Sequence, residues 1–279
     1  MLQLNITSIS GKIETFEFEN QITVEKLKEE LENKCGCKKK NLTIISSNKE
    51  TELKNNENID FTDNTLTYLV NEKKTFKTKK ELQIAISNFA WNEEIINIYG
   101  IPNEWDVSDI TDMSKLFWRN TIWNEEIGNW DVSQVTNMSR MFEDAHKFNQ
   151  DISGWDVGSV TNMEGMFYNA LIFNKPLYWN VSNVYNMSYM FENALLFNQK
   201  LSWNVSKVWN MRYMFHNAQS FNKQLIWDVS KVTDMKNMFY NAESFNKKLD
   251  WNVNNVDDMK NMFCFTELEK NNNLPKWYK

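Results

Sequence analysis

Residues 201–221 read LSWNVSKVWNMRYMFHNAQSF, and this stretch decides the fold. Its apolar residues alternate with polar ones as far as Val205, and from Val208 onward they recur every three or four residues. The same pattern occurs seven times, and its tryptophans stand 24 or 25 residues apart, at Trp105, Trp130, Trp155, Trp179, Trp203, Trp227 and Trp251. A fixed period of this length predicts stacked supersecondary units that share one continuous core.

Each copy of the pattern predicts a short strand followed by a short helix. Strict alternation over residues 201–205 is typical of a strand whose apolar side chains face the core. Intervals of three and four over residues 208–218 are typical of a helix of two or three turns. Strands joined in this way lie parallel, so we expect residues 101–265 to form an α/β right-handed solenoid with strands on one face and helices on the other.

Composition argues against several classes of function. Lys and Arg total 31 against 37 Asp and Glu, a formal net charge of −6, and the one basic run, residues 73–80, falls mainly in a linker. A surface that follows phosphates needs a concentrated basic face, so we expect no nucleic acid as a partner. The chain has only 7 glycines, which argues against a phosphate-binding loop, and no cofactor is expected.

The expected location is the cytoplasm, or the host cytoplasm or virion if the chain is viral. No apolar run reaches the length of a membrane span, so no membrane insertion is expected, and the first residues lack a signal-peptide pattern. The three cysteines, Cys35, Cys37 and Cys264, are odd in number, and a Cys-x-Cys spacing is too short for an ordinary disulfide.

Residues 1–70 predict a separate α+β domain. Alternating apolar residues on both sides of a turn at residues 8–11 indicate a β-hairpin. A helix is expected to begin after Thr23 as its N-cap, and two further strands are expected at residues 42–45 and 65–70. Strand, strand, helix, strand, strand within about seventy residues is the order of a β-grasp fold.

The same residues resemble ubiquitin. The segments ISGKIETFEFE, ITVEKLKEELENKCG, NLTIISSNKETEL and NTLTYLV are similar to its first turn, helix, third strand and last strand. The resemblance implies an apolar recognition patch at Ile9, Ile45 and Leu69, with receptors of the ubiquitin pathway as partners. These three residues also fit ordinary aliphatic positions of such a domain. Because no Gly-Gly follows Val70, the resemblance implies a built-in module that is not conjugated.

Polar residues 71–77 are expected to be a linker. Thr78 and Glu81 have the spacing of a capping box, so residues 78–100 predict a helical cap that covers the first repeat. Residues 266–279 are expected to form a carboxyl-terminal tail or cap.

The repeat, W-D/N-V-S-x-V-T/x-x-M-x-x-M-F-x-x-A-x-x-F-N, resembles the BspA-type leucine-rich-repeat surface-protein family, whose members are bacterial, protist and large-virus proteins. The resemblance implies a leucine-rich-repeat-like solenoid used for protein contact, adhesion or scaffolding. Because a ubiquitin-like domain replaces an export signal, a eukaryotic or large-virus origin is expected.

Two polar columns recur in every copy. An asparagine that follows the last aromatic residue is expected to form a buried amide ladder to neighbouring backbone, at Asn124, Asn149, Asn174, Asn198, Asn222 and Asn246. The residue after each repeat tryptophan is Asp or Asn, as at Asp106 and Asn180, and no glycine-rich calcium turn accompanies it. We therefore expect no metal site there.

Two further columns vary, and in two adjacent copies both become aromatic. Most copies have Thr in the first column and a basic or small residue in the second, but these two copies carry Tyr185, Tyr189, Trp209 and Tyr213. On a helix, residues four apart share a face, so we expect a four-ring cluster. Tyr and Trp dominate binding hot spots, whereas the alternative is that the rings stack to stiffen the array.

No catalytic set is recognisable, so an enzyme is not expected. His146 and His216 stand alone, and Cys264 lacks the partners of a ligase nucleophile. The sequence favours a non-catalytic adaptor or scaffold that binds a protein partner. The alternative is a structural component of a virion or cell surface whose repeats mediate assembly, adhesion or host contact.

Overall fold

The computed structural model describes residues 2–8, 13–19, 21–35, 42–46, 51–52, 54, 59, 66–70, 75–89 and 92–278. The chain divides into two compact parts, Met1–Lys73 and Lys74–Lys279. We call them the amino-terminal part and the repeat part.

The amino-terminal part is a five-stranded sheet with one helix. Its elements are β1 (Leu2–Ser8), β2 (Ile13–Phe18), α1 (Val24–Cys35), β3 (Leu42–Ser46), β4 (Thr51–Glu52) and β5 (Leu66–Val70). The strand order is β2-β1-β5-β3-β4, and among these pairs only β1–β5 is parallel. The expected strands and helix are thus present, and β4 is an addition. The β-grasp classification stays a prediction.

The helix begins where the sequence predicts. The hydroxyl of Thr23 accepts a hydrogen bond from the Lys26 N–H at 3.3 Å. The apolar face of α1 packs on the sheet, so Val24, Leu27 and Ile44 share one core and are fully buried.

The repeat part begins and ends with short helices. These are α2 (Lys79–Asn88), α3 (Glu93–Tyr99), the 3₁₀ helix η2 (Pro102–Glu104) and α4 (Glu267–Lys270). The Thr78 hydroxyl accepts from the Glu81 N–H, so the predicted helix start is confirmed. Buried residues of α2, among them Leu82 and Ile86, belong to the same core as Trp105.

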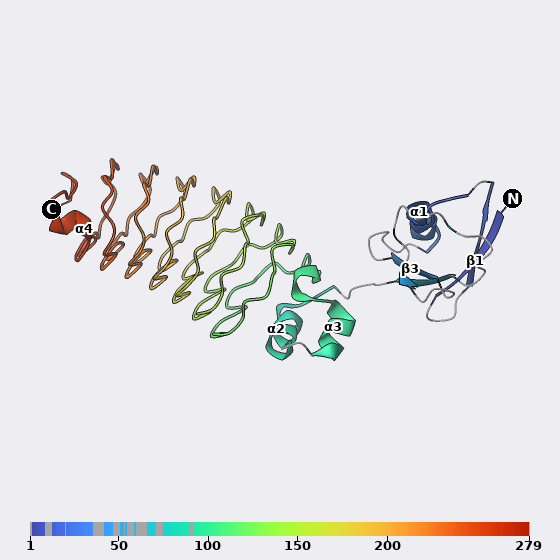
Figure 1. Cartoon of the computed structure of the whole chain (residues 1–279). Helices are drawn as coiled ribbons and strands as arrows, with labels where there is room; N and C mark the ends of the chain where they lie inside the picture. Colours follow the sequence, from blue (N-terminus) through green and yellow to red (C-terminus); the bar gives the residue numbers. More distant parts are fainter. Residues whose placement is uncertain are drawn as a thin grey trace. The chain divides into compact units, whose positions relative to one another are not determined.

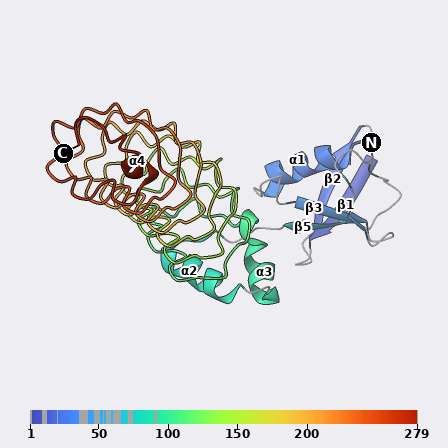
Figure 2. The same ribbon diagram turned by 60° about the vertical axis from the view of Figure 1, so that its left-hand side comes forward.

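We number the copies of the pattern repeat 1 to repeat 7 from their tryptophans, Trp105 to Trp251. Between η2 and α4, the described chain contains neither a regular helix nor a strand longer than an isolated bridge. The expected strand at residues 201–205 and the expected helix at residues 208–218 are therefore wrong. Figures 1 and 2 show successive turns of chain side by side, without helices or arrows.

The reason for the missing helix lies in the backbone angles. Two residues in each repeat have left-handed φ, as at Tyr213 and Asn217, both with φ 57°. A right-handed helix cannot continue through such residues. Where these positions hold Asn or Gly, as at Asn237 and Gly165, the sequence does carry a signal for the left-handed region.

Regular bonding between repeats replaces regular secondary structure. From Met211 to Asn217, every second N–H of repeat 5 donates to a carbonyl of repeat 6, including Met211 to Asp234 at 2.9 Å and Phe215 to Met238 at 2.8 Å. The intervening N–H groups close turns within the repeat, as from Met214 to Met211 at 3.2 Å. Backbone polar groups are thus satisfied although the segment is neither helix nor sheet.

Three columns of stacked rings form the core. Neighbouring tryptophans, such as Trp179 and Trp203, have ring centroids 6.4 Å apart and planes within 1°. Phe191 stacks on its counterpart Phe215 at 5.5 Å and on Phe197 of its own repeat at 4.0 Å. Each ring in these columns is buried, so the three columns stabilise the fold.

The carboxyl-terminal end extends the tryptophan column by one ring. Trp277 stacks on Trp251 at 6.4 Å, and its indole N–H donates to the Leu249 carbonyl at 3.1 Å. Four repeat tryptophans make the same bond, as from Trp203 to the Leu177 carbonyl, whereas the Trp251 indole N–H has no partner within the described part of the chain. Residues 266–279 therefore end the stack with an eighth indole.

Candidate functional site

The recurrent asparagines stabilise the scaffold. The side-chain oxygen of Asn174 accepts from the Asn198 N–H at 2.9 Å, and Asn198 accepts in turn from Asn222 at 3.0 Å. The predicted ladder to neighbouring backbone is confirmed. Its amides are half-buried or exposed rather than buried, because this column lies at the surface of the turn.

A second amide ladder was not predicted. Asn193 donates to Asn169 at 2.7 Å, Asn217 donates to Asn193 at 2.7 Å, and Asn241 donates to Asn217 at 2.6 Å. All four residues occupy the second left-handed position of their repeats. Asparagine tolerates this backbone conformation and can bond along the stack, so one residue type serves both needs.

The column after each repeat tryptophan makes turns. The Asp131 carboxylate accepts from the Ser133 N–H at 3.1 Å, and the Asn204 amide oxygen accepts from the Ser206 N–H at 3.1 Å. The same bond to the N–H two residues later recurs along the column. Among the described residues, no group of three acidic, His or Cys side chains is placed to hold a metal ion.

Trp209 and Tyr185 project from adjacent repeats. Their side chains are 47% and 45% exposed, whereas every ring of the core columns in these repeats is buried. The Trp209 N–H donates to the Tyr185 carbonyl at 3.0 Å, so the two backbones are direct neighbours. Both residues are described in full, and no ring stacking is found between them.

The other two predicted aromatic residues stack on each other. The rings of Tyr189 and Tyr213 lie 5.2 Å apart with planes 16° from parallel, and both are half-buried. The Arg212 guanidinium lies 5.3 Å from the centre of the Tyr213 ring. Burial raises the pKa of the Tyr189 hydroxyl. The predicted four-ring cluster is therefore a stacked pair beside two separate exposed rings, and it lies on turns rather than on helices.

A histidine and a carboxylate lie next to the stacked pair. His216 Nδ1 is 3.2 Å from the Glu192 carboxylate, and the His216 ring stacks on Tyr240 at 5.1 Å. Glu192 is buried, and neither His216 Nδ1 nor the second carboxylate oxygen of Glu192 has a hydrogen-bond partner among the described residues. The sequence-based view of His216 as an isolated surface residue missed this contact, because the partners are 24 residues apart.

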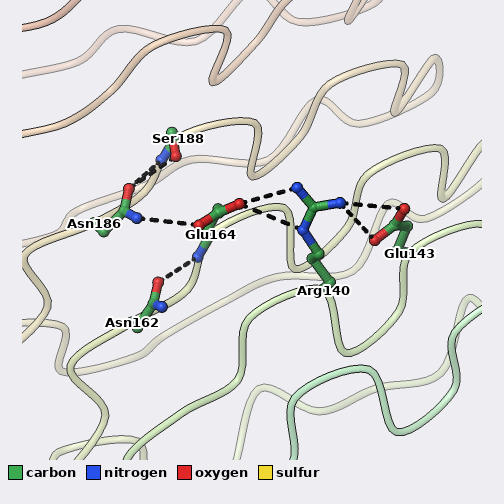
Figure 3. Close-up of polar contacts among 6 residues, drawn as sticks. All are labelled: Arg140, Glu143, Asn162, Glu164, Asn186 and Ser188. Atoms are coloured by element: carbon green, nitrogen blue, oxygen red, sulfur yellow. Dashed lines mark hydrogen bonds and ion pairs between the residues drawn. The ribbon is translucent and has the colours of Figure 1, made fainter.

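In repeats 2 and 3, which precede the aromatic residues along the chain, the corresponding surface is polar. Arg140 contacts the Glu143 carboxylate of its own repeat at 3.2 Å and the Glu164 carboxylate of the next repeat at 3.0 Å (Figure 3). Burial tends to lower the pKa of Arg140, but the two carboxylates outweigh it and the net change is upward. Gly165 has φ 57°, and a Cβ on it would lie 3.2 Å from the Arg140 side chain. This glycine thus makes room for the ion pair.

The predicted patch of the amino-terminal part is only partly visible. Ile9 lies outside the described residues, and so do the side chains of Ile45 and Leu69. The strand register pairs Ile45 with Thr67 and Thr43 with Leu69, so Ile45 and Leu69 alternate along their strands with the buried Ile44 and Leu66.

Cys264 and His146 belong to no metal-binding group among the residues that the structure describes. Cys264 is a free, half-buried thiol whose pKa is raised, first by burial and then by Glu269. A raised pKa disfavours the thiolate that a nucleophile needs.

No helix among the described residues is long and apolar enough to span a membrane.

The stacked copies define this chain as a repeat protein. It belongs to the family described as "Mycoplasma protein of unknown function, DUF285", which matches residues 81–201 and 177–277. A search of curated proteins finds no match. The likeness of residues 1–70 to ubiquitin and of the repeats to BspA-type proteins stays a prediction.

Proposed function

We propose that the protein is a non-catalytic scaffold whose repeats bind a protein partner through Tyr185, Tyr189, Trp209 and Tyr213, here called the aromatic face. The observation that carries the proposal is the exposure of Tyr185 and Trp209 where four of the other five repeats have Thr. Half-exposed aromatic rings that can become fully desolvated on binding are typical interface anchors.

The stacked pair supports the same proposal. Tyr213 and Tyr189 have φ 57° and 61°, a conformation that costs an ordinary L-residue roughly 1–2 kcal/mol. Repeats 6 and 7 place asparagine there, as Asn237 and Asn261, which tolerate these angles better. Repeats 1 and 2 have Lys115 and Arg140 at the same position, with φ 56° and 57°, so the stacked rings rather than the backbone strain set repeats 4 and 5 apart. Arg212 beside the pair adds a cation that an acidic or aromatic partner group can meet.

For the amino-terminal part, we propose a ubiquitin-like module that binds receptors of the ubiquitin pathway through Ile9, Ile45 and Leu69. The mixed sheet order and the register of Ile45 and Leu69 support this proposal. Ile45→Ala in the full chain is expected to weaken binding to isolated ubiquitin-binding domains at least about tenfold, as measured by calorimetry, in line with loss of a buried interface anchor. Binding unchanged in this variant contradicts the patch.

The aromatic face is tested with substitutions drawn from the repeats themselves. A quadruple variant, Tyr185→Thr, Trp209→Thr, Tyr189→Asn and Tyr213→Asn, gives repeats 4 and 5 the residues of repeat 6 in both columns. Partners captured by the tagged full chain are quantified by isotope-labelled mass spectrometry for wild type and variant. We expect one or a few partners to fall more than tenfold, since each desolvated aromatic anchor contributes about 2 kcal/mol or more.

The matched control is Tyr178→Ser, because Tyr178 is 79% exposed at a different column and repeat 4 has Ser202 there. The control is expected to keep the partners that the quadruple variant loses. Equal capture by wild type and the quadruple variant contradicts the proposed function and leaves the rings a packing role.

A further inference from the structure

A second surface of the repeats separates its charges along the stack. It consists of the residues that precede and follow the last aliphatic residue of repeats 1 to 6, and we call it the charged edge. Repeats 1 and 2 place acidic residues before this aliphatic residue, and repeats 3 to 6 place lysines there. The charged residues before the aliphatic residue are Glu125, Glu126, Asp151, Lys175, Lys200, Lys223, Lys247 and Lys248, and one charged residue, Asp250 of repeat 6, follows it.

These charges have little ionic compensation among the described residues, although the pKa of Asp151 is lowered first by hydrogen bonds from Ser153 and also by the charge of Lys175. None of them takes part in an ion pair among the described residues, and Glu126 accepts only a 3.5 Å hydrogen bond from the Asn103 amide. Elsewhere in the repeats opposite charges do meet, as between Arg140 and Glu164 at 3.0 Å. The charged edge therefore offers an acidic end and a basic end to an external surface.

The side chains on the charged edge also alternate in size. After the aliphatic residue, repeat 3 has Tyr178 and repeat 5 has Ile226, which are 79% and 90% exposed. Repeat 2 has Ser153 and Gly154 there, lining a hollow of about 300 Å³ that Glu126 and Asp151 also line. Repeat 4 has Ser202, which lines a hollow of about 210 Å³ together with Tyr178 of the preceding repeat. Large exposed residues thus alternate with small residues set in hollows.

We propose that the charged edge binds the charged edge of a second copy of this chain in antiparallel orientation, about a two-fold axis between repeats 3 and 4. Such an axis places repeat 1 against repeat 6, repeat 2 against repeat 5 and repeat 3 against repeat 4, twice each. Glu125 and Glu126 then face Lys247 and Lys248, and Asp151 faces Lys223.

The same axis matches the shapes. Tyr178 of one copy lies opposite Ser202 of the other, and Ile226 lies opposite Ser153 and Gly154. A parallel arrangement in register would instead bring the lysine-bearing repeats of one copy against those of the other, and the acidic repeats against the acidic repeats. Like charges meet near the axis, where Lys175 faces Lys200, and at each end, where Asp250 lies towards Glu125 and Glu126. The antiparallel pair is therefore the arrangement in which most charges and both exposed apolar residues find a complement.

The interface is weak and sensitive to salt. Its ion pairs are solvent-exposed, so each contributes little and is screened as ionic strength rises. Two apolar residues per copy supply the area removed from water. The proposal does not depend on the aromatic face, so Tyr185→Thr together with Trp209→Thr is a control that keeps the dimer.

The test is a charge exchange in the full chain, followed by sedimentation at several protein and salt concentrations. One variant carries Glu125→Lys and Glu126→Lys, and the other carries Lys247→Glu and Lys248→Glu. We expect wild type to dimerise more weakly at high salt, and each variant alone to dimerise at least about tenfold more weakly, because like charges then face each other twice.

Mixing the two variants provides the decisive result. In the antiparallel heterodimer both contacts regain opposite charges, so the affinity is expected to return to within about threefold of wild type. A single chain with all four substitutions is expected to regain self-association as well. Tyr178→Ser should weaken the dimer of wild type without abolishing the recovery by mixing.

Three results overturn the proposal. The first is wild type that remains monomeric at the highest protein concentration. The second is a dimer whose affinity is unchanged by both charge reversals. The third is a charge-reversed pair that fails to recover on mixing while both variants retain the wild-type circular dichroism spectrum. If wild type is monomeric but binds vesicles containing phosphatidylserine through Lys247 and Lys248, the basic end instead meets an anionic surface.

Discussion

The two parts of this chain satisfy their backbones in different ways. In the amino-terminal part, the ladder of β1 to β5 and one helix provide the pairing, and the core residues come from many sequence positions. In the repeat part, the bonds run from each copy to the next and join the same two columns each time, as from Phe191 to Met214 and from Phe215 to Met238. Repetition in register therefore replaces regular secondary structure, and the column that a residue occupies sets its role.

Removal of a core ring should cause the largest loss of stability, and this loss should be confined to the repeat part. Phe191 is fully buried between Phe167 and Phe215, so Phe191→Ala is expected to cost about 3–5 kcal/mol. Because the repeat part and the amino-terminal part have separate cores, hydrogen exchange should accelerate across the repeats and remain unchanged in α1. Acceleration in both parts would show that the two cores unfold as one.

The unpredicted amide ladder gives the next effect. Asn217→Ala removes hydrogen bonds to Asn193 and Asn241 and places alanine at φ 57°, so a loss of about 2 kcal/mol is expected in urea unfolding. Asn217→Gly keeps the backbone conformation available and should lose only about 1 kcal/mol. Equal losses in the two variants would mean that the backbone conformation contributes nothing.

The N-cap of α4 allows the contribution of an ordinary helix cap in the repeat part to be measured. The buried Thr266 hydroxyl accepts from the Glu269 N–H at 3.1 Å and donates to the Phe263 carbonyl at 2.7 Å. Thr266→Ala should therefore cost about 1 kcal/mol in thermal unfolding. Thr266→Ser keeps the hydroxyl and is the matched control, expected to lie closer to wild type than alanine does.

The smallest effect is expected at the stacked tyrosines. Tyr213→Asn loses the ring contact with Tyr189, about 0.5–1.5 kcal/mol, and gains a residue better suited to φ 57°. The two changes nearly cancel, so the free energy of unfolding should change by less than about 0.5 kcal/mol. A loss above about 2 kcal/mol in this variant would mark the pair as a packing device.

Much of the repeat architecture follows from the sequence because the pattern occurs seven times. The buried columns of Trp203, Val205, Met211 and Phe215 are those that the periodicity selects. The conformation between them does not follow, because intervals of three and four are shared by a helix and by consecutive turns. The left-handed residues distinguish the two, and in repeats 4 and 5 their identity as Tyr189 and Tyr213 conceals that signal.

The candidate site was predictable as a set of residues but not as a geometry. Deviations from a column identified Tyr185 and Trp209 as unusual, and the structure leaves both half-exposed. Contacts between repeats, such as His216 with Glu192, join positions 24 residues apart and leave no local mark in the sequence. The pairing of Arg140 with Glu164 was missed for the same reason.

The most direct test of the account measures partner capture and the thermal midpoint together for the double variant Tyr185→Thr and Trp209→Thr. The account predicts that partners of the aromatic face fall more than tenfold while the midpoint stays within about 2 °C of wild type, as for other exposed surface substitutions. A midpoint lowered by about 5 °C or more with capture unchanged would contradict the claim that these columns serve binding and not the fold.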